Sequence, residues 1–170
     1  MPRGYEPRLN RKAAPWALVG IPALSVMLGS LASLPTIAMY PLLPPLGLLM
    51  LLAWRTLVRD LWPSWVALFF GFFDDLFSGQ PIGSAMLLWT SVFLILDIFD
   101  RWMMWRDYRQ DWAIAGSLIA VVLIAGLGLA NSAGGNTSAI VIIPQIIVSI
   151  LAFPLAVRTC AWLDRLRWRL

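Results

Sequence analysis

The sequence lacks histidine and has a single cysteine, Cys160. Histidine is the commonest general base and the commonest metal ligand, so its absence removes the usual starting point for both kinds of site. One cysteine forms neither an intramolecular disulfide nor a cysteine metal cage. A phosphate-binding loop, a metalloprotease helix, a cofactor fingerprint and internal repeats are also missing. The residues therefore indicate no cofactor and no metal centre.

Charge is scarce as well. Charged residues make up 13% of the 170 residues, where a soluble globular chain carries roughly a quarter. Hydrophobic residues make up 60%, which is more apolar surface than a water-soluble fold of this size can bury. The net charge of +4 does not indicate nucleic-acid binding, because that function needs a contiguous basic face on a soluble domain. The composition predicts a membrane protein whose environment is the lipid bilayer.

Apolar runs long enough to cross a hydrocarbon core of about 30 Å occur six times. We predict an all-α fold, a polytopic bundle of about six transmembrane helices over residues 16–163. A cytoplasmic tail, residues 1–15, precedes this membrane domain, and a basic cytoplasmic tail, residues 164–170, follows it. The predicted spans are 16–34, 36–54, 61–77, 82–99, 112–130 and 139–157.

The segments at and between the ends of the spans also allow predictions. Pro41, Pro44 and Pro45 lack a backbone N–H, so they should kink or interrupt the second span near its start. The short connection at 34–36 predicts a tight hairpin between the first two spans. The charged, aromatic segment 100–111 predicts a loop or a short helix lying on the membrane surface.

Basic residues fall on one side of this topology. The N-terminal tail and the segments after the second, fourth and sixth spans hold four, two, three and four Lys or Arg residues, which account for all 13. The three opposite loops hold none. The positive-inside rule makes the basic side cytoplasmic, so both chain ends face the cytoplasm. Nine of the ten tryptophans, all except Trp89, also lie at or near that interface.

Small and polar residues recur at helical spacing through the third span and into the turn after it. Small residues let a second helix approach closely, which is how packing faces form in lipid. We therefore expect this stripe to face protein, with phenylalanines elsewhere around the helix. The stripe consists of Ser64, Ala67, Leu68, Gly71, Asp74, Asp75 and Ser78.

Asp74 and Asp75 lie inside an apolar stretch near the outer end of this span, where a carboxylate needs a partner or water. One interpretation makes them a binding or proton site at the external face. The other is structural: they bond the 78–83 turn through its N–H groups, or a hydroxyl such as Ser84. Adjacent helical residues diverge by about 100°, so a catalytic carboxylate pair is not indicated.

Two more polar residues lie within predicted spans. Asp97 lies near the cytoplasmic end of the fourth span, together with Asp100 and Arg101, and should form solvated interfacial pairs. Gln145 in the sixth span is a candidate for an interhelical hydrogen bond.

This order of features resembles the bacterial rod shape-determining protein MreD family, over roughly residues 14–162. The likeness is most specific in 62–89, WPSWVALFFGFFDDLFSGQPIGSAMLLW, where a glycine and an acidic residue with leucine precede a small turn into the next helix. Pro44-Pro45-Leu46 and Trp54-Arg55 also look like the second helix of that family. The matching turn residues are Gly71, Asp74, Asp75, Leu76, Ser78, Gly79, Gln80, Pro81, Ile82 and Gly83.

The resemblance implies a non-enzymatic, multi-pass protein of the cell inner (cytoplasmic) membrane, with no cofactor. Such a protein would bind the scaffold protein MreC and, with it, the elongation-specific glycosyltransferase and transpeptidase of peptidoglycan synthesis, linking them to cytoplasmic MreB filaments. Homodimer formation stays open. The residues expected at packing or partner surfaces are Ser64, Ala67, Gly71, Asp74, Asp75, Ser78, Gly79, Pro81 and Gly83.

The family fold is similar to the membrane subunits that bind substrate in energy-coupling-factor transporters. A small-molecule-binding transporter subunit is therefore the alternative function. It would need a polar or aromatic pocket with a lid, whereas the predicted outer loops have only about three, four and eight residues. An intramembrane enzyme is a third interpretation, and it lacks a convergent acid–base set.

Overall fold

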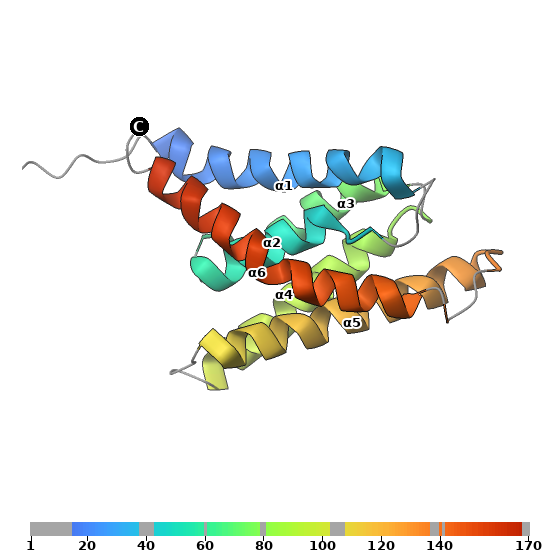
Figure 1. Cartoon of the computed structure of the whole chain (residues 1–170). Helices are drawn as coiled ribbons and strands as arrows, with labels where there is room; N and C mark the ends of the chain where they lie inside the picture. Colours follow the sequence, from blue (N-terminus) through green and yellow to red (C-terminus); the bar gives the residue numbers. More distant parts are fainter. Residues whose placement is uncertain are drawn as a thin grey trace, which may run out of the picture.

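The computed structural model describes residues 15–37, 43–59, 61–78, 81–102, 108–136, 140 and 142–167. Within these residues the chain forms helices and no strand, which confirms the all-α prediction. Figure 1 shows the helices side by side in a bundle. They are α1 (Pro15–Ile37), α2 (Leu46–Leu57), α3 (Val66–Ser78), α4 (Ser84–Trp102), α5 (Tyr108–Ser132) and α6 (Ile142–Arg167).

The short helix α2 lies at the centre of the bundle. The other helices contact one another in the order α1, α3, α4, α5, α6 and back to α1, and α2 packs against α1, α5 and α6. Eight of the twelve residues of α2 are buried, and Trp54 is fully so. An almost uniformly apolar helix fits such an enclosed place, since it has no polar face to offer water.

The second helix begins at Leu46, ten residues after the predicted start at residue 36. Its first backbone bond runs from the Leu49 N–H to the Pro45 carbonyl, at 3.0 Å. Pro44 and Pro45 therefore interrupt the predicted span rather than kink it, because neither residue donates a backbone hydrogen bond. Pro41 lies outside the described residues.

Four other helix ends differ from the ends of the predicted spans. Helix α1 continues through the connection expected at 34–36. Helix α3 starts at Val66, and the N–H groups of Val66 and Ala67 bond the Pro63 and Ser64 carbonyls, so residues 61–65 are not part of the helix. Helices α4 and α5 include most of the segment 100–111, expected as a loop or a short surface helix, and only 103–107 lie outside the described residues. Helix α6 runs to Arg167 and thus includes most of the predicted tail.

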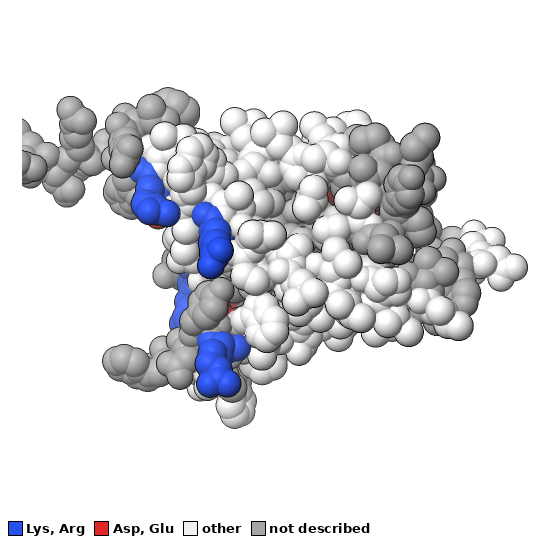
Figure 2. Space-filling model, viewed as in Figure 1, with Lys and Arg blue, Asp and Glu red and all other residues white. Residues whose placement is uncertain are grey.

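Large apolar side chains remain exposed along the helices, among them Leu24, Leu94, Leu151 and Leu155, each more than half exposed. Figure 2 shows Lys and Arg gathered at one end of the molecule, where α1 begins and α6 ends, and mostly uncharged side chains elsewhere on the described part of this face. Two helices of the described chain, Arg109–Ser132 within α5 and Ile142–Arg167, are long and apolar enough to cross a membrane.

Candidate functional site

The turn between α3 and α4 is built around the carboxylate of Asp75, which is 3% exposed. Its two oxygens accept hydrogen bonds from the N–H groups of Gly83, Ala85 and Met86, at 2.9, 2.8 and 3.1 Å, and from the Ser84 hydroxyl at 3.1 Å. Of the two interpretations, the structure realises the structural one for Asp75, including the bond to Ser84.

Asp75 acts as the cap of α4 from the preceding helix. The Leu87 N–H bonds the Gly83 carbonyl at 3.0 Å, which places Gly83 at the start of α4. Glycine has no side chain to satisfy the free N–H groups of the first turn, and Gly83 adopts a φ of +98° that other residues rarely tolerate. A carboxylate supplied from α3 satisfies these donors and lies at the positive end of the α4 dipole.

Gly71 sets the distance between the same two helices. A Cβ added to Gly71 would lie 2.6 Å from the Met86 Cα and 2.7 Å from the Ala85 carbonyl oxygen. Ala67, one turn earlier, is fully buried. Gly71 of the predicted stripe thus faces the chain's own α4, and Ala67 is buried beside it along α3. Both positions are already packed and leave little surface for a separate partner. The prediction fails for Leu68, which is 39% exposed, and for Phe70, which was expected away from the stripe but is buried.

The remaining predicted residues are divided between the two ends of the bundle. Asp74 interacts with the Ser30 hydroxyl of α1, away from the α4 cap. Ser78 and Pro81 are half-buried at the turn between α3 and α4, and Gly79 lies outside the described residues. Ser64 lies at the opposite, basic end, so the structure does not bring it together with the turn.

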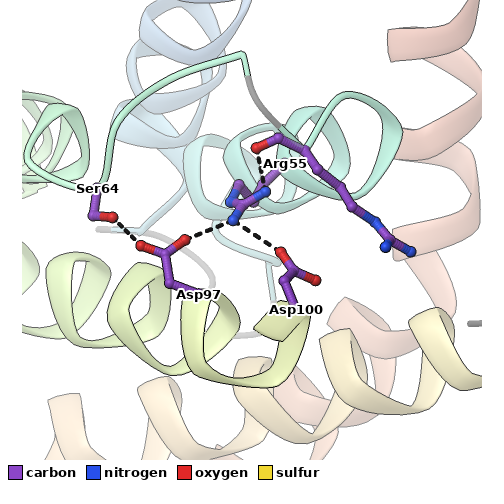
Figure 3. Close-up of polar contacts among 5 residues, drawn as sticks. Arg55, Ser64, Asp97 and Asp100 are labelled. Carbon is purple, nitrogen blue, oxygen red and sulfur yellow. Dashed lines mark hydrogen bonds and ion pairs between the residues drawn. The ribbon is translucent and has the colours of Figure 1, made fainter. Parts of the chain in front are cut away.

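Arg55, at the end of α2, forms a second polar site at the basic end (Figure 3). Its guanidinium contacts Asp97 at 2.6 Å and Asp100 at 2.9 Å, both on α4, and also donates to the Arg59 carbonyl. The Ser64 hydroxyl donates to the other oxygen of Asp97. Arg55 is 7% exposed, whereas Asp97 is 31% exposed. This Arg55 cluster ties α2 and the turn before α3 to α4.

The Arg55 cluster corrects the prediction for Asp97. A solvated pair with Arg101 was expected, but the direct partner is Arg55 from another helix, 42 residues earlier, and Arg101 acts only as a nearby charge. One sequence signal marks Arg55 and Asp97 as candidates for ion pairs: both residues lie near the end of an apolar helix on the predicted cytoplasmic side. A sequence pattern does not say which of the helices that end there are neighbours, so the pairing itself was not predictable.

Gln145 forms a long-range hydrogen bond, but not the interhelical one that was predicted. Its side-chain amide donates to the Leu43 carbonyl at 3.0 Å, which joins α6 to the non-helical segment before α2. At the basic end, Arg167 contacts Asp164 at 2.6 Å, donates to the Leu18 carbonyl of α1 at 2.8 Å and lies over the Trp54 ring. Long-range bonds therefore join the helices at both ends.

Replacing Arg55 by glutamine should reduce the free energy of unfolding by about 2 kcal/mol. Glutamine leaves Asp97 and Asp100 without their shared cation, and breaking a buried ion pair costs about 3–5 kcal/mol, which the exposure of Asp97 reduces. Thermal unfolding of the purified protein in detergent measures the loss. Arg101→Gln is the matched control, because Arg101 is exposed. Equal stability of the two variants would contradict a structural role for the Arg55 cluster.

The charged groups of both sites are bonded within the chain. Asp75 accepts bonds from backbone N–H groups and from the Ser84 hydroxyl, and Arg55 and Asp97 neutralise each other. The described residues contain no group of three His, Cys, Asp or Glu that could hold a metal ion. An open hollow of about 390 Å³ lies between the start of α4 and the end of α5, and its described lining has no charged side chain. What the geometry can do is hold helices together.

No protein-family model, curated protein or solved structure matches this chain.

Proposed function

We propose that this chain is a multi-pass protein of the cell inner membrane and a non-enzymatic component of the bacterial cell-elongation complex, with the role of the MreD family. In that role it binds MreC and, with it, the glycosyltransferase and transpeptidase of peptidoglycan synthesis, and is linked indirectly to MreB filaments. The helices would cross the bilayer with the basic end in the cytoplasm.

The α3–α4 hairpin is the observation that carries the proposal. Three of the residues that resemble the MreD family have a defined place in it: Gly71 allows close contact, Asp75 caps α4, and Gly83 provides the positive φ. These residues are needed together to form one hairpin. A chance match of the whole pattern is therefore a less persuasive explanation of the resemblance.

The surface chemistry supports the membrane part of the proposal. The exposed apolar side chains on α1, α4 and α6 would be costly in water and suit lipid. The described arginines lie at one end, as the positive-inside rule requires of a cytoplasmic side. With α2 and α3 only twelve and thirteen residues long, about 18 and 20 Å, the bundle suits a bilayer that adapts locally around them.

The outer surface favours a scaffold over a transporter subunit. The described lining of the outer hollow contains Ser84 and Ser132 as its polar side chains, and Ser84 already bonds Asp75. A small polar ligand would find few groups there to recognise it. Recognition by helix surfaces needs no such pocket.

A pull-down tests the proposal directly. The tagged chain, extracted in mild detergent from the inner-membrane fraction of its native cells, should co-purify with MreC and the wall-synthesis enzymes, as identified by mass spectrometry. A tagged, unrelated six-helix membrane protein expressed to the same level is the control. Recovery of ATPase subunits in place of MreC would favour the transporter alternative and reject the scaffold role.

A further inference from the structure

One face of α6 changes character along its length. Ile147, Leu151 and Leu155 are exposed and are followed on the same face by Arg158, Trp162 and Arg165, also exposed. Spacings of three and four residues keep these side chains in one row, because a helix turns every 3.6 residues. We call the row of Arg158, Trp162 and Arg165 the α6 basic row.

Neither arginine of the α6 basic row is neutralised within the described part of the chain. Arg158 makes no ion pair there, and Arg165 uses only its Nε, which donates to the Ala161 carbonyl at 3.2 Å. Arg167 differs, since it is buried and contacts Asp164. The α6 basic row thus has two exposed guanidiniums that form no ion pair within the described residues.

The depth of Arg158 favours a nearby anion. From Ile142 to Arg158 the helix rises about 24 Å, which is less than the roughly 30 Å of the hydrocarbon core. With α6 across the bilayer, the Arg158 guanidinium lies at the inner boundary of that core, and a charge there needs a partner. Arg165, about 10 Å further along, lies among the headgroups. Trp162 between them suits the interface.

We propose that the α6 basic row binds the phosphate of an anionic phospholipid in the cytoplasmic leaflet, while the acyl chains lie along Leu151 and Leu155. Guanidinium binds phosphate through paired N–H groups, and the tryptophan ring covers the glycerol region. The inference rests on the proposed placement of the chain in the membrane but requires no protein partner.

Lipid binding to the purified protein tests the inference. The protein in a neutral detergent is titrated with phosphatidylglycerol or with phosphatidylcholine, and bound lipid is counted by native mass spectrometry. At roughly 1 kcal/mol per arginine near an anionic lipid surface, Arg158→Gln together with Arg165→Gln should weaken phosphatidylglycerol binding about thirtyfold. Arg158→Lys with Arg165→Lys keeps the charge but loses the paired N–H groups, so it should weaken binding less than the glutamine variant does. Gel filtration verifies that each variant stays folded.

A second charge-matched variant makes the test specific. Arg101→Gln with Arg109→Gln removes the same charge from the same end of the molecule. Because Asp97 lies close to Arg101, phosphatidylglycerol binding should fall less than about threefold in this variant. Equal losses in the two double variants would overturn the α6 site in favour of a general charge effect. Equal binding of both lipids, or displacement of phosphatidylglycerol by a polyglutamate peptide, would overturn the lipid assignment. Each outcome is independent of MreC recovery.

Discussion

Replacing Asp75 by alanine should lower the free energy of unfolding by about 3 kcal/mol and the Tm by about 5–10 °C. The substitution leaves the N–H groups of Gly83, Ala85 and Met86 without their acceptor, at a place where Asp75 is 3% exposed and water does not readily replace it. Loss of a helix cap costs about 1 kcal/mol, and bonds to a charged acceptor are stronger than neutral ones. Thermal unfolding in detergent, followed by circular dichroism, measures the change.

The neighbouring carboxylate is the control for Asp75. Asp74→Ala removes the same charge from the same turn of α3, but Asp74 is half-buried and interacts with the Ser30 hydroxyl rather than with the start of α4. Its effect should be less than half as large. If the two alanine variants lost equal stability, the cap would not be what holds the hairpin.

Gly71→Leu should destabilise the folded bundle by about 3 kcal/mol or more while still inserting into the membrane. Even the Cβ would lie 2.6 Å from the Met86 Cα, so α3 and α4 must separate. A side chain facing another side chain can rotate away, but here the obstacle is backbone. Insertion persists because leucine is more hydrophobic than glycine. Carbonate extraction measures insertion, and thermal unfolding measures the bundle.

Gly128→Leu is the matched control for Gly71. A Cβ at Gly128 meets nothing within 4 Å, so leucine there should be tolerated. Loss of MreC from the pull-down with Gly71→Leu, at unchanged Tm, would instead mean that Gly71 contacts the partner directly. Unchanged Tm with unchanged recovery would refute the close contact between α3 and α4.

The fold class and the order of the helices were predictable, whereas their ends were not. Apolar runs show where helices lie, but they do not show which part of a run is helical. Pro44 and Pro45 allowed either a kink or an interruption, and the structure has an interruption. Helix α6 continues beyond its apolar part because Arg167 finds Asp164, Leu18 and Trp54 to bond, none of which hydrophobicity reveals.

The two polar sites differ in how much of each could be predicted from the sequence. Asp75 and its partners lie within eleven residues of one another, so local spacing predicts that the carboxylate reaches the turn and Ser84. Arg55 and Asp97 lie 42 residues apart on helices that a sequence alone does not place side by side. Local polar contacts follow from the sequence, and long-range ones follow only from the packing of the bundle.

The central place of α2 bears on how the chain is assembled during synthesis. Helix α2 leaves the ribosome before α4, α5 and α6, so only α1 is present to cover it at first. Arg55 has no ion-pair partner on α4 until Asp97 has been made, and Trp54 lacks its contact with Arg167 until the end of the described chain has been made. The enclosure of α2 is thus completed by the end of α6, and in the proposed membrane setting a chain that stops before α6 would leave this helix exposed to lipid or to membrane proteases.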